Sequence, residues 1–113
     1  MLTYNIPPHL RGDTWDGINS IIITSNNIPL NLTGATVKME FREDIDSPVV
    51  LNLSTTNGKI TISTPLSGTI SIPETIIDIP FGKYIYDLQV TLASGYNKTY
   101  MKGSWEIVAD VTK

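Results

Sequence analysis

The sequence contains no cysteine among its 113 residues, and its only histidine is His9. The absence of cysteine excludes disulfide bonds, thiolate zinc sites and a cysteine nucleophile. A single histidine also excludes any metal site that needs two imidazoles from one chain. A domain of this size without disulfides suits a reducing compartment. We therefore expect no metal and no cofactor.

Charged residues are scarce, at 17% of the chain against about 25% in a typical globular protein. The eight Lys and Arg residues are scattered and the net charge is −3, whereas phosphate binding needs clustered cations. No apolar run exceeds three residues, and the N-terminus lacks the basic start and apolar stretch of a secretion signal. The sequence predicts no nucleic-acid partner, no membrane span, and a location in the cytoplasm or in an assembly built there.

β-Branched residues are abundant, with 16 Ile, 14 Thr and 6 Val against 3 Ala and 1 Gln. Such side chains lose χ1 freedom in helices and pack well on pleated sheets, whereas Ala and Gln favour helices. The composition therefore predicts an all-β fold. A length of 113 residues is typical of one domain, and an apolar share of 41% is enough for one core.

Apolar and polar residues alternate with period two along several segments, as expected for strands with one face in water. The segments are 36–42, 49–53, 60–62, 70–72, 83–92 and 99–107, preceded by a first strand over about 14–24. About seven short strands joined by turns predict an antiparallel β-sandwich of immunoglobulin-like style, with a barrel as the alternative. Asn57-Gly58 is typical of a type I′ hairpin turn, and 73–78 favours one short helical turn.

Residues 1–12 differ from the rest of the chain, because they carry Pro7-Pro8, show little alternation and have no obvious pairing partner. We predict an extended N-terminal arm over 1–12 and a single sandwich domain over 13–113. If the arm docks onto a partner, the side chains predicted to bind are Tyr4, Ile6, Pro7, Pro8 and Leu10.

Two further aromatic residues are candidates for binding. Tyr100 has the opposite parity to Met101 and Trp105 in its strand, so that strand has a face more apolar than water favours. A partner could cover that face. Alternatively, Tyr96 and Tyr100 form the pair of exposed aromatics that a carbohydrate-binding or adhesin-like module would need.

No group of side chains indicates catalysis. His9 lies in the Pro-rich arm without a supporting Ser and Asp, and the chain lacks a Gly-rich phosphate loop. Glu43, Asp44 and Asp46 lack the spacing of a calcium loop, which favours a solvated loop. A carboxylate pair acting as acid and base would have to come from residues far apart in sequence, among Asp13, Asp16, Asp78, Asp87 and Asp110. We predict a protein that is not an enzyme.

Four motifs follow one another along the chain: RGDTW at 11–15, IPLNLTGATVKM at 28–39, FGKYIYDLQ at 81–89 and GSWEIVADVT at 103–112. Their order resembles the small β-sandwich domains of tailed-phage structural proteins, in particular the N-terminal domain of the phage baseplate upper protein. In that family Asp is commoner at the position of Asn31. The resemblance implies a module without catalytic residues that docks on a virion and forms oligomers. The family's stalk and receptor-binding part have no counterpart before Lys113, so the resemblance does not carry receptor binding over to this sequence.

These observations predict a non-enzymatic bacteriophage virion structural protein, as a connector, a baseplate or tail subunit, or a capsid-attached subunit. It would be assembled in the bacterial host cytoplasm and would dock through its N-terminal arm and its sheet edges. The expected partners are other virion structural proteins and further copies of the same chain. The alternative is a carbohydrate-binding or adhesin-like β-sandwich module.

Overall fold

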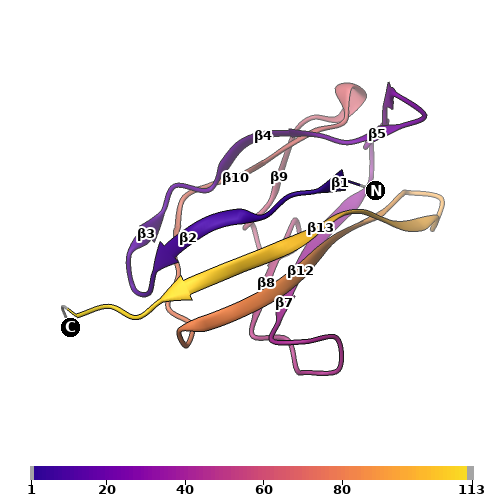
Figure 1. Cartoon of the computed structure of the whole chain (residues 1–113). Helices are drawn as coiled ribbons and strands as arrows, with labels where there is room; N and C mark the ends of the chain where they lie inside the picture. Colours follow the sequence, from indigo (N-terminus) through magenta and orange to yellow (C-terminus); the bar gives the residue numbers. More distant parts are fainter. Residues whose placement is uncertain (1, 112–113) are drawn as a thin grey trace.

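The computed structural model describes residues 2–111, so residue 1 of the predicted arm and residues 112–113 of the predicted domain lie outside it. Two β-sheets pack face to face, and one 3-10 turn, η1 (Pro65–Ser67), interrupts the strands (Figure 1). Within this range, no helix has the length and apolar character needed to cross a membrane. The predicted all-β sandwich is confirmed.

The larger sheet has the strand order β1-β13-β12-β7-β8, and β2 also pairs with β13. Its strands are β1 (Leu2–Thr3), β2 (Ile6–Leu10), β7 (Thr36–Arg42), β8 (Leu51–Ser54), β12 (Gly82–Thr91) and β13 (Asn97–Val108). The pairs among β7, β8, β12 and β13 are antiparallel, whereas β1 and β2 run parallel to β13. The sheet is therefore mixed rather than purely antiparallel.

The smaller sheet has the order β4-β10-β9 and is antiparallel throughout. Its strands are β4 (Ile18–Ile22), β9 (Thr61–Thr64) and β10 (Thr69–Ile72). Two short pairs complete the fold: β3 (Thr14–Trp15) with β11 (Thr75–Ile76), and β5 (Thr24–Ser25) with β6 (Ile28–Pro29). Immunoglobulin-like sandwiches place their third, sixth and seventh strands in one sheet and their second, fifth and fourth in the other. Here β7, β12 and β13 correspond to the first group, and β4, β10 and β9 to the second.

The core lies between the two sheets, and it is built from the apolar positions of the alternating segments. Its most fully buried side chains include Val37, Met39, Phe41, Ile70, Ile72, Tyr84, Leu88, Trp105 and Ile107. Tyr84, near the start of β12, donates its hydroxyl to the carbonyl oxygen of Pro80. A tyrosine bonded in this way to the preceding corner is a recurrent feature of immunoglobulin-like domains.

The N-terminal segment is extended, as predicted, but it is paired within the larger sheet. Leu2 lies opposite Met101 and Ile6 lies opposite Trp105. Gly103 permits this approach, because a Cβ there would lie 1.8 Å from the backbone carbonyl oxygen of Tyr4. Parallel pairing needs a long connection, so no hairpin turn beside the segment could indicate it in the sequence.

Two local predictions are wrong. The positive φ pair of a type I′ turn falls at Asn26 (53°) and Asn27 (64°), between β5 and β6, and not at Asn57-Gly58. Asn57 instead uses its side chain, which accepts a hydrogen bond from the Ser54 backbone N–H at 3.0 Å. The segment 73–78 contains β11 rather than a helical turn, because Thr75 and Ile76 pair with β3.

Candidate functional site: an open sheet edge beside an apolar groove

β4 forms one edge of the smaller sheet, since within residues 2–111 it pairs with β10 and with no other strand. Ile23, directly after β4, donates its N–H to the carbonyl oxygen of Gly68 at 2.8 Å, on the β10 side. Peptide groups alternate between the two sides of an antiparallel strand, so those of Ile22 point to the open side. The edge therefore presents backbone donors and acceptors to which another strand could pair.

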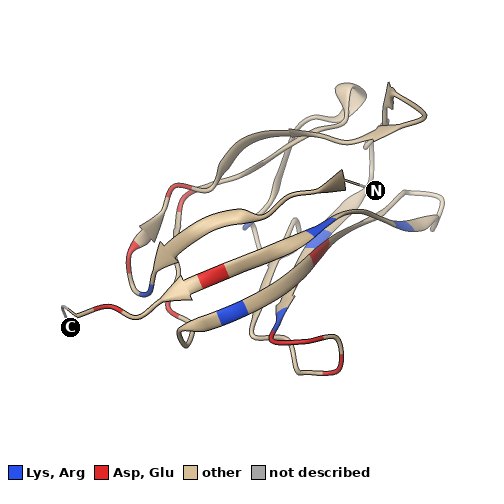
Figure 2. Cartoon of the chain, viewed as in Figure 1, with Lys and Arg blue, Asp and Glu red and all other residues tan. Residues whose placement is uncertain are grey.

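The whole smaller sheet is free of charge. The chain has no charged residue from 17 to 37 or from 60 to 73, and these ranges include β4, β9 and β10. Figure 2 shows the Lys, Arg, Asp and Glu residues on the larger sheet and on the loops instead. Proteins usually protect an open edge with charged side chains or proline. Neither is present in β4.

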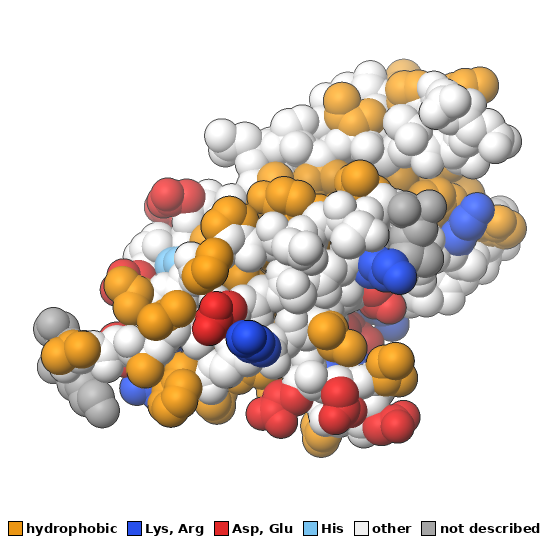
Figure 3. Space-filling view, viewed as in Figure 1, with side chains coloured by type: hydrophobic (Ala, Val, Ile, Leu, Met, Phe, Trp, Pro, Cys, Tyr) orange, Lys and Arg blue, Asp and Glu red, His pale blue; other side chains and the backbone are white. Residues whose placement is uncertain are grey.

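A groove follows the β4 edge, between it and the β1 end of the larger sheet. Its lining is apolar along β4 and β1, and the residues 24–26 with Lys98 and Thr99 add a polar part to its larger pocket. The groove consists of a pocket of about 660 Å³ and an adjoining pocket of about 350 Å³. Leu2, Ile21, Ile22 and Met101 line both pockets, which makes the groove continuous. Figure 3 shows hydrophobic side chains along the furrow between the two sheets.

Several apolar side chains of this groove are exposed. The exposed fractions are 58% for Ile22, 57% for Leu2 and 40% for Tyr4. Scattered exposed apolar residues are ordinary, but a contiguous group beside a groove is typical of an interaction site. We define the β4 surface as the open edge of β4 together with Leu2, Tyr4, Ile21, Ile22 and Met101.

Two open edges of the larger sheet, those of β8 and β2, are protected. At β8, the side-chain amide of Asn57 donates to the Asn52 carbonyl oxygen at 2.9 Å and accepts from the Ser54 N–H. At β2, Pro7 and Pro8 have no N–H to offer. The other edge of the smaller sheet, β9, is uncharged, but it exposes hydroxyl-bearing side chains and is followed by Pro65. The β4 surface is thus the edge best suited to accept an added strand.

The structure brings only part of the predicted set to this surface. Tyr4 and Tyr100 line the groove, and Tyr100 is half-buried with the ammonium of Lys98 5.6 Å from its ring centre. Tyr96 is 56% exposed in the turn between β12 and β13. The carbohydrate-binding alternative needs two exposed rings, and half-buried Tyr100 is poorly placed to be the second.

The remaining predicted residues lie along β2. Pro7, Pro8 and Leu10 are exposed, but Ile6 is only 5% exposed and belongs to the core. Ile6 is therefore not accessible to a partner while β2 is in place. Its burial follows from the pairing with β13, which turns its side chain inward next to Trp105.

Sequence reasoning missed Leu2, Ile21, Ile22 and Met101. One signal was present, namely the run Ile21-Ile22-Ile23. Because side chains alternate between the faces of a strand, three successive isoleucines must place at least one on the outer side. Ile23 is buried and Ile22 is exposed, as this rule requires.

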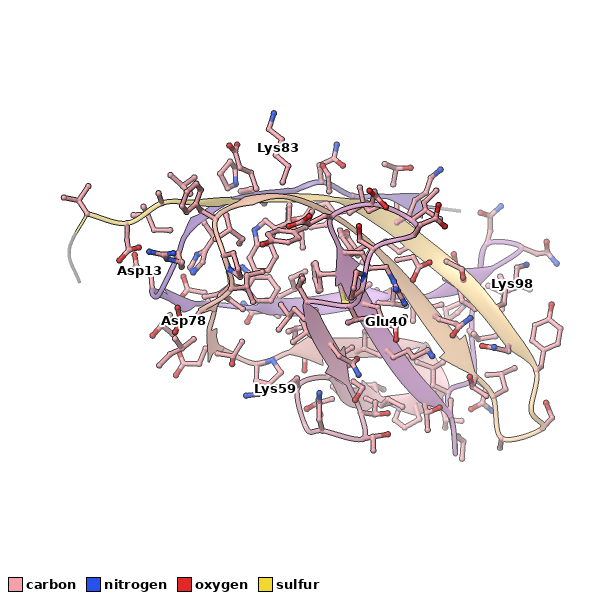
Figure 4. The ribbon with its side chains drawn as sticks, turned by 90° about the horizontal axis from the view of Figure 1, so that it is seen from below. Asp13, Glu40, Lys59, Asp78, Lys83 and Lys98 are labelled. Carbon is pink, nitrogen blue, oxygen red and sulfur yellow. The ribbon has the colours of Figure 1, made fainter. Side chains whose placement is uncertain are left out.

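Among residues 2–111, Lys98 is the one Lys, Arg, Asp, Glu or His residue that lines the groove; the others lie elsewhere. Figure 4 shows Asp13 and Asp78 at one end of the sandwich and Lys98 at the other. Arg11 and Asp110 form an ion pair of 2.9 Å, and His9 Nε2 lies 3.0 Å from the Asp13 carbonyl oxygen. In the described part of the chain, no three His, Asp or Glu side chains gather closely enough to hold a metal.

The most perturbed ionisable groups are two tyrosines of β12. Burial raises the pKa of Tyr86, and nearby Tyr4 raises it further; the Tyr86 hydroxyl donates to the Tyr4 carbonyl oxygen at 2.5 Å. Burial also raises the pKa of Tyr84, with an added contribution from Glu43. Both hydroxyls are held by backbone carbonyls, so their role is to fix the structure.

A scan against known protein families finds no match for this chain, and a search of curated proteins finds none either. The groups exposed at the β4 surface are suited to binding another chain. The open backbone of β4 can pair with an extended strand, and the groove can receive its apolar side chains.

Proposed function

We propose that this protein is a non-enzymatic assembly subunit that attaches to partner chains by strand addition at the β4 surface. The observation that carries this proposal is an unpaired, charge-free edge strand lying beside an apolar groove. In strand addition, main-chain hydrogen bonds give affinity and pockets for alternate side chains give specificity. The Ile22 peptide group can form the main-chain hydrogen bonds. The groove lined by Leu2 and Met101 can receive the side chains of the added strand.

The particle in which it assembles is that of a tailed bacteriophage, where the chain serves as a connector, a baseplate or tail subunit, or a capsid-attached subunit. The support is that the order of four motifs resembles that of phage β-sandwich domains. Two of these motifs fall where a turn leads into a strand: Gly34 has a φ of 74° just before β7, and Gly82 opens β12. The partners are other virion structural proteins and further copies of the chain.

The test is mass spectrometry of purified particles from a phage that encodes this chain. We expect the chain in fixed proportion to the other structural proteins of the particle. Its absence from particles in which those proteins are detected would contradict the virion assignment.

Complementation then tests the docking surface. Ile22→Lys places a charge on the open edge and is expected to abolish incorporation of the chain into particles. Ile76→Lys is the matched control, since Ile76 is 65% exposed on β11, outside the β4 surface. Equal incorporation of both variants would contradict docking through β4.

A further inference from the structure

We infer that the β4 surface binds a second copy of this chain, with the two β4 strands pairing antiparallel about a two-fold axis. The two three-stranded sheets would then join into one continuous sheet. This inference rests on the proposed assembly role and names the partner at its docking surface.

The charge distribution favours a second copy as the occupant over a charged partner. The chain has a net charge of −3, and all its charged residues lie outside β4, β9 and β10. Two copies that meet through other surfaces bring these charged groups together. Two copies that meet through their smaller sheets bring together strands without any charge, and Lys98, over the Tyr100 ring, is the one charged residue in the described part of the chain that lines the groove. Like-charge repulsion is therefore small at this contact.

The geometry of the edge is also self-complementary. The Ile22 peptide faces the open side, and an antiparallel neighbour with the same sequence offers the same donor and acceptor in return. A contact of this kind uses one patch twice and closes after two copies. Pairing of β4 with β9 of another copy would use two different edges and would continue into a filament. The apolar groove lies beside β4 and not beside β9, which favours the closed contact.

The apolar side chains of the β4 surface supply the driving force. Ile22 and Leu2 are each more than half exposed in the single chain, and they line the same groove. In the paired form the two Ile22 side chains lie beside each other on the outer face of the joined sheet, and each covers part of the other. Burial of apolar area is the main favourable term in protein association.

Size-exclusion chromatography with light scattering tests the inference on the full-length chain over a range of concentrations. We expect a dimer for the wild type. Ile22→Lys should weaken dimerisation at least about tenfold, because two Lys side chains meet near the two-fold axis. Ile76→Lys should leave the dimer unchanged. Thermal unfolding is the check on folding, and we expect both variants to be folded because each replaces an exposed side chain.

Hydrogen exchange locates the contact independently. The Ile22 amide should exchange more slowly at concentrations that favour the dimer, while amides of β9 should be unaffected. A wild type that stays monomeric, or a dimer that forms equally well with Ile22→Lys, would overturn the inference.

The two proposals fail in distinguishable ways. If the purified chain is monomeric but Ile22→Lys still prevents incorporation into particles, the second-copy inference is wrong and the assembly role stands, with a different virion chain at β4. If the dimer forms as expected but particles lack the chain, the virion assignment is wrong and the β4 contact stands.

Discussion

The two sheets of this sandwich differ in the charge of their exposed surfaces. On the larger sheet, charged side chains occupy the outward positions of alternating strands: Asp87 lies opposite Glu40 on β7 and opposite Lys102 on β13. Figure 4 shows Lys83, also from this sheet, pointing away from the body of the protein. The smaller sheet has no charged residue, and its edge strand β4 has an exposed Ile22.

This difference separates two uses of a sheet edge. The larger sheet closes its β8 edge with the Asn57 side chain and its β2 edge with Pro7-Pro8, and charged side chains on its outer face favour contact with water. The smaller sheet lacks these protections beside its groove. An unprotected edge is a liability for a free protein, but it is what strand addition requires. The contrast is therefore the basis of the proposed assembly role.

The largest expected effect comes from reopening a protected edge. Gly103→Ala places a Cβ 1.8 Å from the Tyr4 carbonyl oxygen, so β1 must move away from β13. We expect a loss of about 3 kcal/mol in the free energy of unfolding, at the upper end of the range for overpacking. Urea unfolding measures this loss. Ser104→Ala is the control, because it removes only an exposed hydrogen bond to Asn5.

Gly103→Ala also tests whether the paired N-terminal segment protects this edge of the larger sheet, in contrast to the open β4 edge. If the paired N-terminal segment is what keeps this edge of the larger sheet from associating, Gly103→Ala should also form larger species at high concentration. A variant that is destabilised but remains the size of the wild type would show that the charges of the larger sheet are protection enough.

Much of the larger sheet could be predicted from the sequence, because its strands are long and alternate cleanly. The segments 36–42, 83–92 and 99–107 correspond to β7, β12 and β13, with the apolar positions inside. The N-terminal segment was predicted to be extended but not to be paired. Its partner β13 lies at the other end of the chain, and local patterns carry no information about such a contact.

The β4 surface could be predicted only in part. Tyr4 was predicted to bind as part of the N-terminal arm and Tyr100 because of its parity in the strand. Leu2 was not singled out within the arm, and Met101, at 3% exposed, has the parity and the burial of a core residue. Ile22 lies in a run of apolar residues that is equally typical of a buried strand. Whether such a residue is buried or exposed depends on which strand ends up at the edge of a sheet, and that is a property of the whole topology.

The second expected effect, of intermediate size, concerns alkaline pH. The smaller sheet has no ionisable side chain, so the sheets contribute pH dependence only through the larger one. Burial raises the pKa of Tyr86 and Tyr84 above the ordinary value of 10.0. The folded protein then holds these protons more tightly than the unfolded chain. Their contribution to stability is complete below pH 10 and is lost as the pH rises through the folded-state values.

Unfolding followed from pH 8 to 12 measures this loss. Tyr86→Phe removes one of the two titrating groups and should make the fall in stability above pH 10 less steep. At neutral pH it should cost about 1 kcal/mol, because the hydrogen bond to Tyr4 is lost. Tyr96→Phe, at an exposed site, should leave the alkaline profile as in the wild type. A Tyr86→Phe profile as steep as that of the wild type would mean that alkaline unfolding originates outside the core.

The smallest expected effect tests what the charges of the larger sheet are for. Asp87 lies between Glu40 on one neighbouring strand and Lys102 on the other, so its unfavourable and favourable interactions oppose each other. Asp87→Asn should change the free energy of unfolding by no more than about 0.5 kcal/mol, as is typical of surface charges. Urea unfolding at low and high salt measures the change. A loss well above 1 kcal/mol would mean that these charges hold the sheet together. If the free energy of unfolding is instead unchanged, the charges on the outer face keep that face in contact with water and do not stabilise the fold. The absence of charge then costs the smaller sheet no stability. Its charge-free surface is then best explained by contact with another chain.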